Sequence, residues 1–285
     1  MSNQKTVVIT GCSSGFGHVT ALHLARHGWQ VFATVRKESD QARLLAEAMA
    51  VVPGNAGRLV PVMCDITNAE DVTGLGQTVA AATPRLAGLV NNAGTAFPAP
   101  LELLPLDELR EQLEINVVGH LAVTQALLPS LKAGHGTIIN VSSESGRVVF
   151  PITGAYHMSK FALEAMSDCL RIELAPFGVR VVVLEPGASP TAIWATSLQR
   201  AQTKLGGRDT RAYATLIAAV EKASARRAAT GYPPQLLADL VLKVLNSPNP
   251  RARYPLPRQT AWIIALRQLL PDVWWDRIVR RVLKW

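Results

Sequence analysis

Six short hydrophobic runs alternate with longer helical patterns along the chain, and this alternation constrains the fold more than any other feature. The runs are nearly continuous in apolar and β-branched residues, which is typical of parallel strands buried on both faces. We expect strands at Lys5–Thr10, Trp29–Val35, Arg58–Cys64, Gly88–Val90, Thr137–Val141 and Val179–Leu184. Helical patterns fill the intervals, at residues 15–27, 38–50, 68–82, 106–132 and 153–176. The sequence therefore predicts an α/β fold, a doubly wound parallel sheet with helices on both faces.

Length and composition allow this fold to be a single domain. The chain has 285 residues, 48% of them hydrophobic and 18% charged, which is a globular composition with enough apolar residues for a large core. We expect the domain to span residues 1–258. An irregular segment within it, at about 188–235, follows the last expected strand and should form a lid at the carboxyl edge of the sheet.

The cysteines and the hydropathy indicate where such a chain resides. Cys12, Cys64 and Cys169 are odd in number and widely spaced, so neither a disulfide framework nor a metal site is expected. The N-terminal residues lack the pattern of a signal peptide, and no run of about 18 apolar residues predicts a transmembrane helix. These features predict a cytoplasmic protein that needs no metal ion.

The C-terminal tail, residues 259–285, differs from the rest of the chain in charge and aromatic content. Residues 251–285 hold eight Arg or Lys against two Asp, a surplus of six within a net charge of +8. The tail also holds Trp262, Trp274, Trp275 and Trp285. Tryptophan and basic residues beside apolar ones fit a helix on a membrane surface, and they fit equally a helix packed on the body or on a partner subunit. We expect no nucleic-acid binding, because the basic patch is short and no nucleic-acid motif accompanies it.

A glycine-rich turn joins the first expected strand to the first expected helix. Small residues there let the backbone approach a pyrophosphate, and the helix N-terminus offers free N–H groups and a positive dipole end. The residues of this turn that we expect to contact a dinucleotide are Gly11, Ser13, Ser14, Gly15, Phe16 and Gly17. An ordinary βα turn can be rich in glycine as well, but a strand before and a helix after are the context that a dinucleotide site requires.

A tyrosine and a lysine stand four residues apart in the last helical pattern. Tyr156 and Lys160 therefore share one helix face. A free tyrosine hydroxyl, with a pKa near ~10, is a poor base at neutral pH. A nearby ammonium favours the phenolate, so we expect Lys160 to lower the pKa of Tyr156 and to fit it for acid–base catalysis.

The motifs TGxxxGxG, NNAG and YxxxK follow one another in the order and at the distances seen in the short-chain dehydrogenase/reductase family, which the chain resembles. The resemblance covers about residues 5–256, and residues 146–151 and the tail look most like retinol- and hydroxysteroid-type members. It implies a Rossmann-type fold, a nicotinamide cofactor, and hydride transfer between an alcohol and a ketone or aldehyde. It also implies homo-oligomers, dimers or tetramers.

The resemblance assigns cofactor contacts beyond the glycine turn. In the family, an Asp after the third strand contacts the adenine edge, and NNAG lets the ribose approach. A Pro-Gly pair with a downstream Thr holds the nicotinamide carboxamide, and the tyrosine and lysine lie against the cofactor. The matching residues here are Asp65, Ile66, Asn92, Ala93, Gly94, Tyr156, Lys160, Pro186, Gly187 and Thr191.

The end of the second expected strand indicates which nicotinamide cofactor is used. An NAD-preferring protein usually offers an acidic residue there, whereas this chain has Val35 followed by Arg36 and Lys37. A guanidinium forms a bidentate contact with a phosphate. The sequence therefore predicts NADP(H), with Arg36 a better candidate than Lys37; a solvated basic turn is the alternative.

Two further catalytic residues follow from the resemblance. Ser143 lies thirteen residues before Tyr156, where the family places the serine that binds the substrate oxygen; Ser142 is the alternative. Asn116 lies within a helical pattern, where Asn is mildly unfavourable. In the family, an Asn at this place bends the helix and holds a water of a proton relay that includes the lysine.

The expected lid is rich in apolar residues, which predicts a hydrophobic pocket for a bulky steroid-, retinoid- or lipid-like alcohol or ketone. These residues are Ile193, Trp194, Leu198, Leu205, Tyr213, Leu216 and Ile217. Two other functions remain open at this stage, because a fold alone does not establish activity. One is a non-catalytic NADP(H)-binding protein, and the other is a membrane-surface scaffold whose tail is its main functional part.

Overall fold

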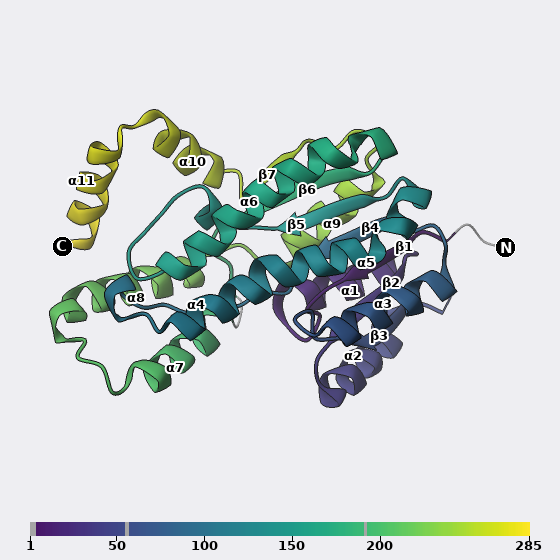
Figure 1. Ribbon diagram of the computed structural model, residues 1–285, viewed down its shortest axis with the longest axis horizontal. Helices are drawn as coiled ribbons and strands as arrows, with labels where there is room; N and C mark the ends of the chain where they lie inside the picture. Colours follow the sequence, from purple (N-terminus) through teal and green to yellow (C-terminus); the bar gives the residue numbers. More distant parts are fainter. Residues whose placement is uncertain (1–3, 55–56, 191–192) are drawn as a thin grey trace.

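One parallel sheet organises the computed structural model, which describes residues 4–54, 57–190 and 193–285 (Figure 1). Within these ranges the sheet has seven strands in the order β3-β2-β1-β4-β5-β6-β7. The strands are β1 (Thr6–Ile9), β2 (Gln30–Val35), β3 (Arg58–Met63), β4 (Gly88–Asn91), β5 (Thr137–Val141), β6 (Arg180–Pro186) and β7 (Arg253–Leu256). The predicted α/β class and the doubly wound parallel sheet are confirmed. The order reverses between β1 and β4, and an open α/β sheet binds its ligands at such a switch point.

Helices cover both faces of the sheet because successive strand residues point to opposite sides. Val7 and Ile9 pack with α1 (Gly15–Arg26), whereas Val8 between them packs against the opposite helix layer. The first layer also contains α2 (Glu38–Val51) and α9 (Gln235–Asn246). The second layer contains α3 (Ala69–Ala82), α5 (Gly119–Gly134) and α6 (Gly154–Leu174). Each strand thus contributes to two cores, as the near-continuous hydrophobic runs predict.

The long helix predicted at 106–132 is interrupted in the structure. It consists of α4 (Leu106–Leu113), one π-helical turn at Glu114–Val118, and α5. Asn116 lies in the π turn, is fully buried, and hydrogen bonds outside its own helix. An extra residue in one turn rotates the side chains that follow it, so the π turn sets the direction in which Asn116 points.

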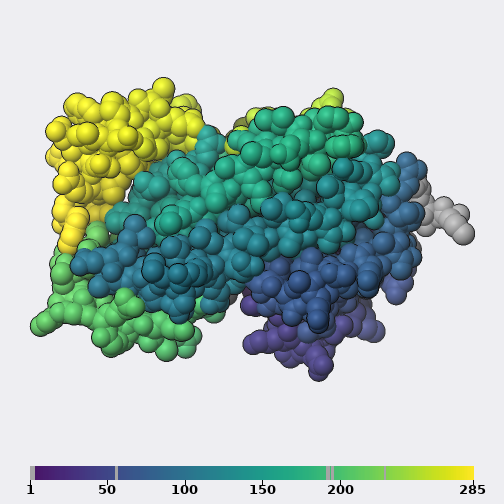
Figure 2. Space-filling view, viewed as in Figure 1, coloured from purple at the N-terminus to yellow at the C-terminus, as the bar shows by residue number. Residues whose placement is uncertain are grey.

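Four helices form the end of the molecule beyond the carboxyl edge of the sheet. They are α7 (Ile193–Leu205), α8 (Ala214–Ala229), α10 (Thr260–Leu269) and α11 (Asp272–Leu283). In Figure 2 the C-terminal helices, in yellow, cover one corner and meet the green segment that contains α7 and α8. Short 3₁₀ turns lie at Leu101–Leu103, Glu144–Gly146, Ala175–Phe177 and Arg211–Tyr213. Of the helices described, none is long and apolar enough to cross a membrane.

The tail packs on the body through one small hydrophobic cluster. Val148, Ile264 and Trp275 are buried against each other, and the ring of Phe150 lies 6.0 Å from that of Trp275. The Trp275 indole N–H also donates to the carbonyl of Val149 at 3.4 Å. The sequence leaves open whether the tail lies on a membrane surface, on the body or on a partner subunit. This contact places α10 and α11 on the body, where they form part of its wall.

Candidate active site

A cavity of about 870 Å³ runs along the carboxyl edge of the sheet. It begins at the turn after β1, passes the ends of β2 to β6, and continues between α8 and the C-terminal helices. Its position is the switch point that the strand order creates. Most of the predicted site residues line it: Gly11, Ser13, Ser14, Gly15, Phe16, Arg36, Asp65, Ile66, Asn92, Ala93, Gly94, Ser143, Tyr156, Lys160, Pro186 and Gly187.

The glycine turn is shaped for a close approach of backbone to ligand. Gly11 has φ +70°, and a β-carbon on it would lie 2.8 Å from the Cα of Ala93. Gly17 lies behind the turn, where a β-carbon would come within 2.4 Å of the Gly11 carbonyl oxygen. In the described structure the Ser14 side chain makes no capping hydrogen bond, and the first turn of α1 holds no acidic residue. The N–H groups at this helix end are therefore directed at the cavity without a competing anion, which fits the pyrophosphate of a dinucleotide.

Basic side chains stand at the adenosine end of the cavity. Arg36 is exposed, and its guanidinium lies 3.7 Å from the carboxylate of Asp65. Burial alone would raise the pKa of Asp65, but hydrogen bonds from Thr67 and the charge of Arg36 lower it. Lys37 is the exposed residue that precedes α2.

Arg43 was not predicted from the sequence. Its guanidinium donates to the carbonyl of Ser13 in the glycine turn. Its position in the second turn of α2 is the signal that could have found it.

The NNAG segment fixes the turn after β4 to the glycine turn. The Asn92 side-chain amide donates to the carbonyl of Thr10 at 2.9 Å and to that of Gly11 at 3.2 Å. The backbone N–H groups of Asn92 and Ala93 both donate to the Thr10 hydroxyl. These bonds join β1 to β4 at the switch point and leave Ala93 and Gly94 on the cavity wall.

Ser143, Tyr156 and Lys160 come together in the middle of the cavity wall. Ser143 follows β5, its hydroxyl donates to the Pro186 carbonyl at 3.3 Å, and it lies close enough to Tyr156 on α6 to act on the pKa of that side chain. Lys160 lies one helical turn further, with its ammonium 5.7 Å from the centre of the Tyr156 ring and donating to the carbonyl of Val141 at 2.9 Å. All three side chains are buried. Ser142, the alternative serine, is buried as well and also lines the cavity.

Burial shifts the pKa values of this group. Burial raises the pKa of Tyr156 to about 12, and the nearby Glu144 adds to the increase, whereas the hydrogen bond with Ser143 opposes it. Burial lowers the pKa of Lys160 to about 8. Desolvation of the phenolate has the largest effect on the pKa of Tyr156 in this arrangement, and the lowering expected from Lys160 stays a prediction. At neutral pH, Tyr156 keeps its proton and Lys160 is mostly charged.

Asn116 lies behind the cavity wall. Its amide oxygen accepts the N–H of Thr95, and its amide nitrogen donates to the Thr95 carbonyl and to the Ser159 hydroxyl, each at 2.9 Å. Ser159 immediately precedes Lys160 on α6. The π turn is thus tied to the helix that carries the tyrosine and the lysine.

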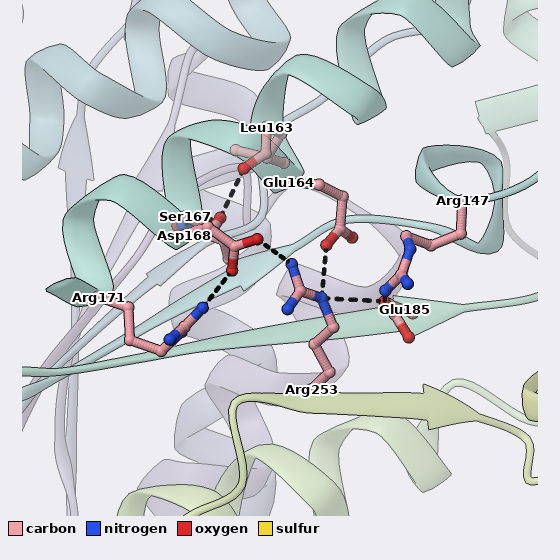
Figure 3. A network of polar contacts seen from close by, with 9 residues as sticks. Arg147, Leu163, Glu164, Ser167, Asp168, Arg171, Glu185 and Arg253 are labelled. Carbon is pink, nitrogen blue, oxygen red and sulfur yellow. Dashed lines mark hydrogen bonds and ion pairs between the residues drawn. The ribbon is translucent and has the colours of Figure 1, made fainter. Parts of the chain in front are cut away.

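A buried ionic network supports the elements that meet at the site (Figure 3). The Arg253 guanidinium from β7 contacts Glu164 on α6 at 3.1 Å, Glu185 on β6 at 3.5 Å and Asp168 on α6 at 2.7 Å. Arg147, four residues after Ser143, donates to Glu185 at 2.8 Å. Glu164 is one turn beyond Lys160, and Glu185 precedes the Pro-Gly pair. The network therefore connects the segments that carry the serine, the lysine and the Pro-Gly pair.

The lid and the tail supply the outer wall of the cavity. Ile193 of the predicted lid lines it, whereas Leu198, Leu205 and Ile217 line a second cavity of about 330 Å³ beside Pro98. Leu216 is buried, and the Tyr213 hydroxyl donates to Glu102. Thr191 and the side chain of Trp194 lie outside the described residues.

Several residues of the outer wall were not predicted from the sequence. They are Glu144, Val220, Ala223, Arg227, Ile263, Leu266, Trp275, Ile278, Val279, Val282 and Leu283. The apolar residues of α11 recur every three or four positions, and this helical spacing is the signal that could have assigned them to a buried face.

Known proteins resemble this chain over its whole length. A family model described as short chain dehydrogenase matches residues 5–202. The chain is 36% identical over 285 residues to the uncharacterized oxidoreductase YusZ of Bacillus subtilis (strain 168), with 99% of each chain covered. It is 34% identical over 290 residues to the NADPH-dependent 3-dehydrocapnine reductase of Ornithobacterium rhinotracheale, with 98% of each covered.

A solved structure has the same fold. The crystal structure of a short-chain dehydrogenase from Streptomyces avermitilis aligns with a TM-score of 0.78 at 26% identity, covering 98% of this chain and 99% of the other. The motifs predicted from the sequence, the switch-point cavity and these relatives agree. The chain belongs to the short-chain dehydrogenase/reductase family of oxidoreductases.

Proposed function

We propose that the protein is an NADP(H)-dependent oxidoreductase that interconverts an alcohol and its ketone or aldehyde, on a bulky hydrophobic substrate. The observation that carries the proposal is the group formed by Ser143, Tyr156 and Lys160 on the wall of a cavity that continues to the glycine turn. Two perturbed titratable groups at one point of a cleft favour catalysis over nucleotide binding alone.

The reduction direction shows what each side chain would do. The substrate carbonyl oxygen accepts hydrogen bonds from the Ser143 and Tyr156 hydroxyls, which stabilise the negative charge that it gains. The reduced nicotinamide, when bound, supplies a hydride to the carbonyl carbon. Tyr156 donates its proton to the oxygen, and the Lys160 ammonium stabilises the phenolate that remains. A tyrosine with a pKa raised to about 12 carries its proton at neutral pH, as the donor in this step must.

Asn116 has a positioning role in this proposal. It fixes Ser159 and Thr95, and it maintains the π turn beside the lysine, where the family places a water of the proton relay. The remaining contacts to the cofactor are those predicted from the motifs, including Thr191.

The cofactor preference rests on the charge at the adenosine end. Val35 stands where an acidic residue would bind a ribose hydroxyl, and Arg36 follows it at the rim of the cavity. A guanidinium at the rim offers a 2′-phosphate a bidentate partner. The relative from Ornithobacterium rhinotracheale, named as NADPH-dependent, supports the same choice. Arg43 beside the glycine turn adds a second positive charge.

The substrate class rests on the outer wall of the cavity. Ile193, Ile263, Leu266 and Val279 present aliphatic groups there, and Trp275 closes the wall against the body. Such a surface gains free energy by covering an apolar substrate, at about 25 cal/mol per Å² of apolar area removed from water. A steroid-, retinoid- or lipid-like ketone fits it better than a small polar one.

The exposed side of the tail supports a second role, contact with an anionic membrane surface. Trp262, Leu269, Trp274 and Val282 are all more than half exposed. Basic residues lie in α11 and directly after it, at Arg277, Arg280, Arg281 and Lys284. Apolar and basic groups on one exposed helix pair are the composition of an interfacial helix. A peripheral membrane enzyme of the cytoplasm, assembled as a dimer or tetramer, is the corresponding proposal for location and partners.

Titration with NADPH and NADH, followed by turnover of a ketone panel, tests the main proposal. We expect NADPH to bind at least about 10-fold more tightly than NADH, and Arg36→Ala to remove most of that preference. Lys37→Ala is the matched control and should change the preference less. Tyr156→Phe should lower turnover about 1,000-fold while NADPH still binds. Equal binding of the two cofactors would contradict the preference, and binding without turnover of any ketone would contradict the reaction.

A further inference from the structure

Glu144 is an acidic residue in an unusual position, directly after Ser143 and on the wall of the cavity. Its side chain is buried, with the residue only 6% exposed. One carboxylate oxygen, Oε1, accepts a hydrogen bond from the Arg227 guanidinium on α8. The other, Oε2, is buried and has no hydrogen-bond partner among the described residues. A β-carbon on Gly187 would lie 3.4 Å from this oxygen, so Oε2 faces the place where β6 ends in the cavity.

Oε2 of Glu144 is a buried acceptor, and a hydrogen-bond donor that reached it would stabilise it. A buried acceptor without a partner costs about 1–3 kcal/mol, and more when it is charged. The bond with Arg227 does not meet this need, because an ionised carboxylate has about four acceptor positions on two oxygens. The cavity itself is the route by which a donor can reach Oε2, and the reacting group of the substrate is expected beside the neighbouring Ser143.

We propose that Glu144 binds a protonated amino group on the carbon next to the substrate's carbonyl, so that the enzyme acts on amino ketones with an apolar remainder. This inference rests on the proposed function, because Ser143 and Tyr156 must hold the carbonyl oxygen. The Ser143 hydroxyl donates to the carbonyl of Pro186 and Oε2 of Glu144 faces Gly187, so the two groups lie along the same short segment at the end of β6, as a carbonyl and its neighbouring substituent require. An ammonium gives a charge-assisted hydrogen bond to a carboxylate, which is about twice as strong as a neutral one.

The Glu144 carboxylate also acts on Tyr156. After burial, its negative charge contributes to raising the pKa of Tyr156. Arg227 balances part of that charge from the lid through Oε1, and Oε2 has no hydrogen-bond partner among the described residues. A cation bound at Oε2 would complete the neutralisation.

Matched ketones test the proposal. We would measure kcat/KM with NADPH for an amino ketone with a long alkyl chain, and for the ketone of equal size that carries a methyl group in place of the amine. The wild-type protein should prefer the amino ketone, and Glu144→Gln should reduce the ratio of the two values about 10- to 100-fold. Glu111→Gln is the control, because Glu111 also lines the cavity and pairs with Arg200 but lies far more exposed. It should keep the wild-type ratio.

Three results would overturn the inference. If Glu144→Gln leaves the ratio unchanged while both ketones are reduced, Oε2 does not bind the amine. If Arg227→Gln lowers the ratio of the two kcat/KM values as much as Glu144→Gln does, the role of the carboxylate is to bind Arg227 and so to position the lid. If Glu144→Gln weakens NADPH binding and leaves the ratio alone, Oε2 serves the cofactor.

A measurement on the wild-type protein alone guards against a variant that fails to fold. Acetylation of the amine removes its charge and should lower kcat/KM at least about 10-fold relative to the free amine. An acetylated substrate that is reduced as well as the free amine would overturn the inference. If the wild type reduces neutral ketones and shows no preference for amines, the inference fails and the proposed function stands. If it reduces no ketone at all, both fail.

Discussion

At the scale of one residue, the burial of Lys160 destabilises the folded protein. The side chain is 4% exposed, and burial lowers its pKa from 10.5 to about 8. A difference of this size corresponds to roughly 3 kcal/mol by which the folded state disfavours the ammonium at neutral pH. The hydrogen bond to the Val141 carbonyl returns about 1 kcal/mol of this. The fold therefore keeps a lysine here at a net cost.

Replacing this lysine with an apolar residue of similar length should stabilise the protein. We expect Lys160→Met to raise the free energy of unfolding by about 2 kcal/mol at pH 7, measured by urea denaturation, and to abolish turnover. Between pH 8 and 10.5 the unfolded wild-type chain binds more protons than the folded one, so wild-type stability rises with pH in that window. The advantage of the variant should shrink over the same window. A variant that is less stable than the wild type at pH 7 would show that burial of Lys160 has no such cost.

Residue positions in the site were predictable, but residue energetics were not. The glycine turn could be located because it lies between a strand and a helix, and the tyrosine–lysine pair because four positions place both residues on one helix face. The serine was assigned from the family resemblance. The pKa values of Tyr156 and Lys160 depend on how much water the surrounding elements exclude, and spacing does not reveal this. Glu144 and Arg227 lie 83 positions apart, so their contact could be seen only after folding.

At the scale of elements, Arg253 joins the edge strand β7 to helix α6 and strand β6 beside the site. Within the described chain, β7 pairs along one side only, with β6, and Arg253 lies opposite Val183. Its guanidinium contacts Glu164, Glu185 and Asp168, and the first two of these are almost fully buried (Figure 3). Burial raises the pKa of Glu185, with Glu164 adding to the increase and the arginines opposing it. Two acidic groups thus share the arginine that neutralises them.

Removal of this arginine should destabilise the protein in a pH-dependent way. We expect Arg253→Met to lower the free energy of unfolding by about 3 kcal/mol at pH 7, because buried carboxylates lose their counter-ion. A carboxylate whose folded pKa is raised takes up its proton more readily in the folded state, so the loss should become smaller as the pH falls from 7 to 5. Arg171→Met is the matched control. Arg171 pairs with the half-exposed Asp168 alone, and its loss should cost less than about 1 kcal/mol at either pH. A pH-independent loss in Arg253→Met would argue against the role of the carboxylates.

Two of the elements that were not predicted from the sequence, β7 and the π turn, share a cause. β7 is four residues long and includes a proline, which is tolerated because an edge strand needs fewer backbone donors. The π turn at Glu114–Val118 keeps the hydrophobic spacing of a helix and differs by one residue in its hydrogen bonding. In both cases tertiary contacts decide the local structure, through β6 for the strand and through Thr95 and Ser159 for Asn116.

At the scale of the whole molecule, the sheet was predictable and the placement of the tail was not. Six strands and five helices follow from local hydrophobic patterns, and β-α-β connections leave few ways to arrange them. The composition of the tail fits several environments equally. Its contact with the body depends on Trp275 meeting residues 148–150, more than a hundred positions earlier. Such distant contacts between amphipathic elements leave no mark in the local pattern.

Helix α11 lines the cavity and carries exposed side chains on which the membrane proposal rests, and its deletion should separate these two features from catalysis. Removing residues 271–285 takes away the wall formed by Trp275, Ile278 and Val282, whereas Ser143 and Tyr156 stay in place. We expect kcat/KM for a bulky ketone to fall at least about 10-fold, because a loss of roughly 60 Å² of apolar contact already corresponds to such a factor. A small ketone should be reduced within about 3-fold of the wild-type rate.

The same truncated protein tests the membrane proposal by sedimentation with vesicles. Full-length protein should sediment with vesicles of anionic lipid at low salt, should do so less at high salt, and should remain in solution with zwitterionic vesicles, because Arg277, Arg280, Arg281 and Lys284 supply the attraction. The truncated protein should sediment with neither. Replacing Ile278 by Ala is the matched control for the wall, since it shortens an apolar side chain and leaves every charge. It should weaken turnover of the bulky ketone and leave sedimentation nearly as it is. If truncation impairs both ketones equally, α11 stabilises the fold as a whole; if sedimentation survives truncation, the membrane contact lies elsewhere.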